Sequence, residues 1–168
     1  MNKKISLFTL IELLVSKTCQ TGVSLSYYLK KENKKESTEI YYTEQTRNDF
    51  RSVSQKVQDK FLSDYNADED GFAILFFTQG FNGEKVVVKN DEGTLFKGDV
   101  TTDKTTGLAK NMRIKSSINT EIHDKETNKT FYINAKKAQK HKFVYVMKDS
   151  KSEKPYKITF SDKLRPAK

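Results

Sequence analysis

The sequence has no tryptophan, only two prolines and two histidines, and a single cysteine, Cys19, among its 168 residues. One cysteine excludes an internal disulfide framework and a cysteine-based zinc site. The sequence also lacks a glycine-rich phosphate loop and a nucleophile elbow. We therefore expect a protein that is not an enzyme and needs no cofactor. A hydrolase that uses His123 and His141 as an acid–base pair is an alternative, which requires both rings to meet at one substrate.

The composition is polar but sufficient for a folded core. Hydrophobic residues make up 35% of the chain and charged residues 32%, yet 11 phenylalanines and 8 tyrosines supply large apolar side chains. Wholesale disorder is therefore not expected. The length allows one ordinary domain plus an extra segment.

The first 22 residues form the most distinctive segment. Two lysines precede an apolar run, Ile5–Val15, which is interrupted by Glu12. The run is shorter than the about 20 residues of a standard transmembrane helix, but its length suits an export signal. We therefore predict an export or membrane-contact segment at residues 1–22 and a polar linker at residues 23–45.

Within this run, the segment Phe8–Val15 (FTLIELLV) resembles the cleavage and methylation motif of type IV prepilins and pseudopilins. The resemblance implies that Phe8 becomes the first residue of the mature chain and that Glu12 neutralises the N-terminal ammonium of a neighbouring subunit. It also implies contact with the membrane or the secretion machinery, and an exported location in the cell envelope or outside the cell. A cytoplasmic location is the alternative if the segment is an ordinary amphipathic or buried helix.

The rest of the chain predicts one helix followed by many strands. Thr46 and Asp49 have the spacing of a capping box, and an apolar stripe at helical spacing follows at Phe50, Val53 and Phe61. From residue 72 onward, apolar and polar residues alternate in short segments. The candidate strands are Phe72–Thr78, Lys85–Lys89, Thr94–Val100, Asn111–Ser117, Asn119–His123, Thr130–Asn134, Lys142–Lys148 and Tyr156–Ser161.

These elements predict a mainly β domain at residues 46–168: an antiparallel β-sandwich of seven or eight strands with Greek-key character, preceded by an amphipathic helix. The continuous apolar run Phe72–Phe77 predicts a central strand buried on both faces. Asn82-Gly83 predicts a hairpin turn between the first two strands, and residues 101–110 are long enough to cross between sheets. The alternative is an α+β, pilin-like fold in which a helix lies on an antiparallel sheet.

An acidic segment follows the predicted helix. Asn66, Asp68 and Asp70 place oxygen ligands at alternate positions before Gly71, as in the first half of a calcium loop. However, Phe77 stands where the closing acidic ligand would be. We therefore expect an acidic turn without metal, with these three residues as weak candidates for metal ligands.

Positive charge is concentrated at the C-terminal end. Residues 134–168 contain ten lysines and one arginine against three acids, a balance of +8, whereas the preceding residues balance at +1. Such a field attracts polyanions, although the dominance of lysine over arginine disfavours nucleic acid. An alternative function is therefore a soluble basic sandwich that binds a polyanion or an acidic protein. The candidate binding residues are Lys136, Lys137, Lys140, Lys142, Lys157 and Arg165.

Overall fold

The computed structural model describes residues 40–167, which form a mainly β unit. The predicted export segment, with Phe8 and Glu12, lies outside the described residues. In chain order the elements are β1 (Tyr42–Thr46), α3 (Gln55–Asp64), β2 (Phe72–Phe77), β3 (Asn82–Asn90), β4 (Gly93–Thr101), β5 (Lys110–Lys115), β6 (Thr120–Asp124), β7 (Lys129–Ile133), α4 (Ala135–Ala138), β8 (Phe143–Lys148) and β9 (Tyr156–Ser161).

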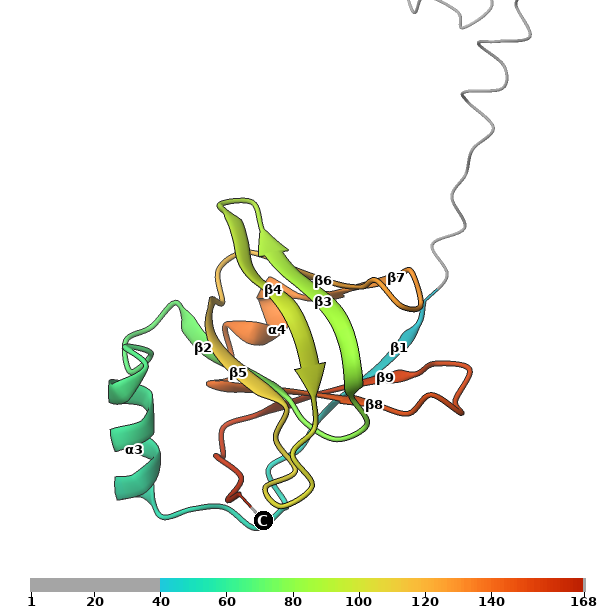
Figure 1. Cartoon of the computed structure of the whole chain (residues 1–168). Helices are drawn as coiled ribbons and strands as arrows, with labels where there is room; N and C mark the ends of the chain where they lie inside the picture. The colour runs from blue at the N-terminus through green and yellow to red at the C-terminus, as the bar shows by residue number, and fades with distance from the viewer. Residues whose placement is uncertain (1–39, 168) are drawn as a thin grey trace, which may run out of the picture. The chain divides into compact units, whose positions relative to one another are not determined.

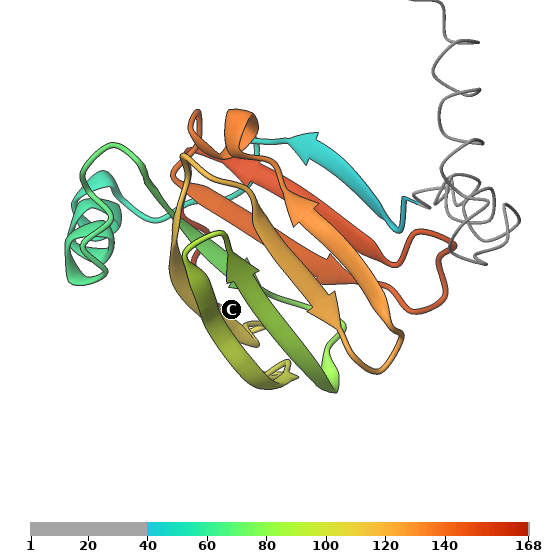
Figure 2. The same ribbon diagram turned by 90° about the horizontal axis from the view of Figure 1, so that it is seen from above.

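The strands form two sheets. The larger sheet has the strand order β1-β9-β8-β2-β5, and the smaller has the order β4-β3-β6-β7. Figure 1 shows β3 and β4 of the smaller sheet in front of β8 and β9 of the larger one. In both views α3 stands beside the larger sheet, close to the start of β2 (Figure 1, Figure 2). The mainly β prediction with two sheets is therefore confirmed.

The larger sheet is mixed, so the prediction of purely antiparallel pairing is wrong for it. β1 runs parallel to β9, and β2 runs parallel to β8. These partners are distant in sequence, and parallel strands need long crossover connections rather than hairpins. Alternation of side chains shows which face a residue occupies but carries no information on strand direction. All pairs in the smaller sheet are antiparallel, as expected.

All eight predicted strands are present, with ends that shift by up to three residues. The ninth strand, β1, was not predicted, because residues 42–45 were assigned to the polar linker. The predicted central strand is also confirmed: β2 lies between β8 and β5, and five of its six residues are buried.

The crossing between sheets at residues 101–110 lies where the sequence predicts it. The prediction of a hairpin turn at Asn82-Gly83 is wrong. These residues begin β3, which lies in a different sheet from β2, and the β3–β4 register shifts between Asn82 and Glu84. The chain turns instead at Gly80, whose φ is +89°, and a Cβ there would lie 1.8 Å from the carbonyl oxygen of Lys148.

The main core lies between the inner faces of the two sheets, and β8 shows how the alternation works. Val144 and Val146 point into the core shared with the smaller sheet, together with Phe131 and Ile122. Phe143 and Tyr145 point to the opposite face and join a second apolar cluster. One strand therefore supplies side chains to two separate environments.

The second cluster packs α3 and its flanking residues on the outer face of the larger sheet. α3 begins at Gln55 with Ser54 as its N-cap, so the predicted start at Thr46 is wrong. Thr46 ends β1, since its backbone is paired with Phe160 of β9. Val53 and Phe61 still reach the cluster. Among the described residues, no helix combines the length and apolar character needed to cross a membrane.

Candidate functional site

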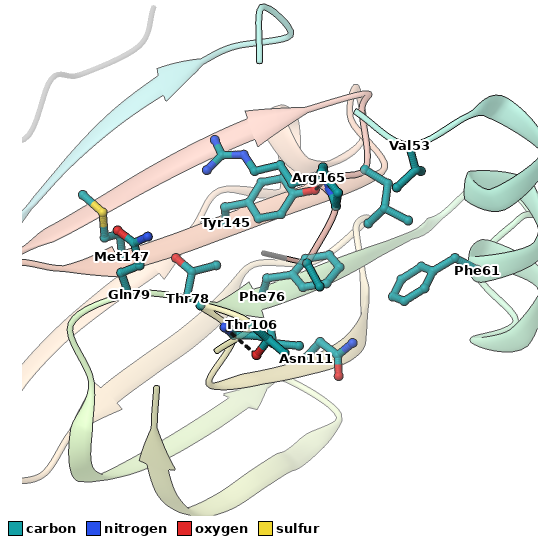
Figure 3. Close-up of a pocket in the computed structure, with 15 residues that line it drawn as sticks. Val53, Phe61, Phe76, Thr78, Gln79, Thr106, Asn111, Tyr145, Met147 and Arg165 are labelled. Carbon is teal, nitrogen blue, oxygen red and sulfur yellow. Dashed lines mark hydrogen bonds between the residues drawn. The ribbon is translucent and has the colours of Figure 1, made fainter. Parts of the chain in front are cut away.

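A pocket of about 490 Å³ lies on the outer face of the larger sheet. We call it the aromatic pocket. Strands β2, β5 and β8 form its floor, and α3, the 101–110 loop and the C-terminal segment surround it. Figure 3 shows the side chains that line it. The lining residues that bear on ligand binding are Phe61, Phe76, Gln79, Asn111, Tyr145, Met147, Leu164 and Arg165.

The pocket is floored by a row of stacked rings. Phe76 lies between Phe61 and Tyr145, with ring centroids 5.8 Å and 4.9 Å away and interplanar angles of 20° and 17°. The two rings of the floor come from adjacent parallel strands, β2 and β8, whose register pairs Phe76 with Tyr145. Such offset stacks favour a flat apolar group placed against them.

Arg165 lies beside these rings (Figure 3). Its guanidinium carbon is 4.4 Å from the centroid of the Tyr145 ring and 4.1 Å from that of Phe50. Arg165 Nε is buried without a hydrogen-bond partner, and Arg165 makes no ion pair with another described residue. Burial lowers the pKa of Arg165, although an arginine of this kind stays charged. Its direct contacts are therefore aromatic faces, and the acid that interacts with it electrostatically, Asp49, is ion-paired with Arg47.

The Tyr145 hydroxyl holds the C-terminal segment over the pocket. It donates a hydrogen bond to the carbonyl oxygen of Lys163 at 3.0 Å and accepts one from the backbone N–H of Arg165 at 3.0 Å. Burial raises the pKa of Tyr145 to about 12. The backbone of this segment is also tied to α3 and its approach: Leu164 N donates to Gln58, and Val53 N donates to Leu164 O.

A second cation lies on the same face of the sheet. Met147 lines the pocket, and Lys157 is its direct partner across the antiparallel β8–β9 pair. Directly opposite residues in such a pair point to the same side. Two of the six predicted polyanion-binding residues, Lys157 and Arg165, are therefore on the face that carries the aromatic pocket.

The other four lie elsewhere. Lys136 and Lys140 are exposed on α4 and just after it. Lys137 is paired with Glu44 of β1 and also lies over the Phe160 ring. Lys136, Lys137 and Lys140 therefore all lie on or just after α4, and Lys142, described next, lies just before β8.

The acidic turn after α3 already contains a cation. Lys142 Nζ donates hydrogen bonds to the carbonyl oxygens of Ala67, Asp68 and Glu69 at 3.1, 3.0 and 2.6 Å. The ammonium is therefore held by backbone oxygens of the turn rather than by its carboxylates. Residues 40–167 contain no group of three or more His, Cys, Asp or Glu side chains that could hold a metal ion. Lys142, predicted to bind a polyanion, is engaged in this turn.

The two histidines have separate partners. His123 Nδ1 lies 2.9 Å from Thr130 Oγ1 on the neighbouring strand of the smaller sheet. His141 Nδ1 lies 3.0 Å from Asp162 Oδ1, just before β8 of the larger sheet. Each ring is oriented by its own side-chain contact.

The sequence reasoning missed a buried charged cluster between the sheets. Lys148 Nζ lies 2.7 Å from Asp124 Oδ2 and 2.9 Å from Glu84 Oε1. The Tyr156 hydroxyl donates to Asp124 Oδ2 at 2.5 Å. Only 4% of the Lys148 side chain and 1% of the Asp124 side chain are exposed. We call these four residues, Glu84, Asp124, Lys148 and Tyr156, the buried cluster.

Charge in this cluster is set by its hydrogen bonds. Burial would lower the pKa of Lys148, but hydrogen bonds to Asp124 and Glu84 outweigh burial and raise it. Burial would raise the pKa of Asp124, but hydrogen bonds from Lys148 and Tyr156 lower it. The resting cluster therefore holds an ammonium beside carboxylates. A sequence signal existed, because Glu84 and Lys148 occupy inward positions in the alternation of β3 and β8.

Comparison with known protein-family models and with curated protein sequences found no match. The geometry of the aromatic pocket and of the buried cluster is therefore what bears on function.

Proposed function

We propose that residues 40–167 form the β-sandwich binding domain of a non-enzymatic, exported or envelope-associated bacterial protein. The aromatic pocket holds a small anionic ligand with a flat apolar body. The observation that carries this proposal is Arg165, a half-buried cation without an acidic partner at the edge of a pocket floored by stacked rings.

The charge of the ligand follows from the charges of the pocket. Arg165 and Lys157 are on the pocket face, and no acidic side chain lines the pocket. An anionic group near Arg165 would supply the missing counter-charge, and the five donors of a guanidinium suit carboxylate, sulfate or phosphate oxygens.

The aromatic residues of the pocket indicate that the uncharged part of the ligand is flat and apolar. Phe61, Phe76 and Tyr145 offer stacking surfaces, while Met147 and Leu164 add apolar walls. A pocket of this size lies in the range of small-molecule sites, which combine an apolar lining with a few orienting polar groups. Asn111 and Gln79 are amide side chains of the lining that could orient such a ligand.

Fluorescence titration with anilinonaphthalene sulfonate tests this proposal, because the probe combines a flat aromatic body with one negative charge. We expect saturable binding by the folded protein, weakened by about tenfold in Arg165→Gln, which corresponds to about 1.4 kcal/mol. The matched control is Lys140→Gln, which removes one exposed charge away from the pocket and should leave affinity unchanged. Equal affinity in both variants, or no saturable binding, would overturn the proposal. Circular dichroism of each variant verifies that it is folded.

Export is the second part of the proposal. It is supported by the Phe8–Val15 motif, in which Glu12 interrupts an apolar run. We expect cell fractionation to find the wild-type protein in the envelope or the medium and Glu12→Lys in the wrong compartment. Glu36→Lys makes the same charge change in the predicted linker and should not alter location. An intact N-terminus on protein found in the cytosol would contradict export.

Polyanion binding through the lysines is the competing function, and the exposed Lys136 and Lys140 favour it. It predicts heparin binding that weakens steeply as salt rises. The double variant Lys136→Gln/Lys140→Gln should weaken that binding, whereas it should leave the aromatic probe unaffected. Absent or salt-independent heparin binding would remove this function.

A further inference from the structure

The buried cluster joins the two sheets through side chains that can react with one another. Lys148 ends β8 of the larger sheet, while Asp124 ends β6 and Glu84 lies in β3 of the smaller sheet. An amine and a carboxyl group are held 2.7 Å apart, with a second carboxylate 2.9 Å from the same nitrogen. The surrounding core is apolar and includes Phe131, whose ring stacks on Tyr156 with centroids 4.3 Å apart.

We propose that Lys148 and Asp124 condense to form an intramolecular isopeptide bond that ties the two sheets together, with Glu84 as the proton carrier. The reaction happens once per molecule and needs no oxidant or co-substrate. An ammonium and a carboxylate become an amide and one water molecule, so charge and atoms balance.

The proton movements follow the observed contacts. Glu84 Oε1, 2.9 Å from Lys148 Nζ, takes one ammonium proton and leaves an amine with a free electron pair. The amine attacks Cγ of Asp124, which forms the C–N bond. Oδ2 then receives two protons, one across the 2.7 Å contact with Lys148 Nζ and one returned by Glu84, and leaves as water when its bond to Cγ breaks.

The other carboxylate oxygen of Asp124 is placed to carry the negative charge of the tetrahedral intermediate. Oδ1 accepts hydrogen bonds from the backbone N–H groups of Glu126 and Thr127 at 2.9 and 3.3 Å. Two fixed backbone donors on one oxygen form an oxyanion hole. The Tyr156 hydroxyl donates to Oδ2 at 2.5 Å and so assists its departure.

Position and burial favour the condensation over the ion pair. Well-oriented intramolecular groups behave as if present at about 10⁵–10⁸ M, and a dry site favours a step that expels water. A buried ion pair also bears a desolvation cost that an amide does not. Because the resting pair is charged, neutralisation through Glu84 limits the rate.

Intact-mass spectrometry of the purified full chain tests the proposal. After incubation of the folded protein at neutral pH until its mass is constant, we expect the wild type to be lighter by one water molecule than its sequence mass. Lys148→Arg, prepared in the same way, should show the full mass and so accounts for any N-terminal processing. A wild-type mass without loss of water means a buried ion pair only and would overturn the proposal.

A tryptic digest locates the bond. Trypsin needs a free lysine side chain, so the wild type should remain uncut after Lys148 and yield one peptide joined to the segment that contains Asp124. Glu84→Gln retains both reacting groups and should slow the loss of water by about 100-fold or more. Loss of water at the wild-type rate in Glu84→Gln, or a water loss located at other residues, would exclude the assigned chemistry.

Discussion

The two faces of β8 hold two cations, the buried Lys148 and the half-buried Arg165, in opposite ways. On the inner face, Lys148 is enclosed between two carboxylates and a tyrosine hydroxyl. On the outer face, Arg165 lies between two aromatic rings and makes no direct ion pair with another described residue. The protein itself therefore neutralises the charge of Lys148, whereas the charge of Arg165 stays available to bind an anionic ligand. A charged side chain indicates a binding site only when the fold leaves it without a counter-charge.

The sharpest test of this contrast removes each cation in turn. Lys148→Met leaves Asp124 and Glu84 buried without a counter-charge, so we expect a loss of about 3–5 kcal/mol in the free energy of unfolding relative to wild-type protein that has not yet lost water. Arg165→Met keeps the contact with the rings and removes a desolvated charge, so its loss should stay below about 1 kcal/mol. Urea denaturation measures both. Equal losses would contradict the contrast.

The end of β8 that carries Lys148 also depends on a close backbone approach. A Cβ on Gly80 would meet the Lys148 carbonyl oxygen at 1.8 Å, and φ there is +89°. Gly80→Ala should therefore cost about 3 kcal/mol. Gly71→Ala is the matched control, because φ is +90° but the space is open, and it should cost about 1 kcal/mol. Similar unfolding midpoints for the two variants would show that the approach is not tight.

The outer face should give stability a dependence on alkaline pH. The folded pKa of Tyr145, about 12, is above the about 10 of an unfolded tyrosine, so its contribution is complete below about pH 10 and is lost as pH rises toward 12. We expect Tyr145→Phe to be less stable than the wild type at neutral pH, because two hydrogen bonds are lost. Between pH 10 and 12, however, its free energy of unfolding should fall by up to about 2 kcal/mol less than that of the wild type. The exposed Tyr132→Phe should keep the wild-type profile. Midpoints of urea denaturation, measured for the wild type and both variants between pH 10 and 12, test this expectation.

Lys142 is an intermediate case, a cation held by neutral carbonyl oxygens at a partly exposed turn. Water can replace the ammonium there, so Lys142→Met should cost only about 1 kcal/mol. Because the carbonyls are already engaged, calcium or a chelator should not shift the melting temperature of the wild type. A calcium-dependent rise in melting temperature would show that Asn66, Asp68 and Asp70 bind metal after all.

The strands were predictable because their alternation records burial residue by residue. Val144 and Val146 alternate with Phe143 and Tyr145, and the structure places the two sets on opposite faces. β1 was not predictable in the same way, because it is a short edge strand whose partner, β9, lies more than a hundred residues along the chain. Sequence periodicity carries no information on such pairings.

The helix start was predicted wrongly, and the contacts of the candidate site residues were not predictable, for related reasons. The capping-box spacing at Thr46 is a local signal that pairing with β9 overrides. Arg165 was a candidate binding residue because of its charge. Its surroundings, however, are set by the rings of Phe50 and Tyr145, which are distant in sequence. Similarly, an inward lysine such as Lys148 indicates a buried partner but does not identify it. Composition predicts that charges exist, whereas only the fold determines which of them neutralise one another.

The parallel pairing of β1 with β9 has a mechanical consequence. Tyr42 lies opposite Tyr156 and Thr46 opposite Phe160, so the two strands point the same way at the edge of the sheet. A force that pulls the chain before β1 away from the chain after β9 would slide these strands along each other. All the hydrogen bonds of the pair would then share the load instead of breaking one after another. The domain would resist extension most strongly along the line that joins its two ends.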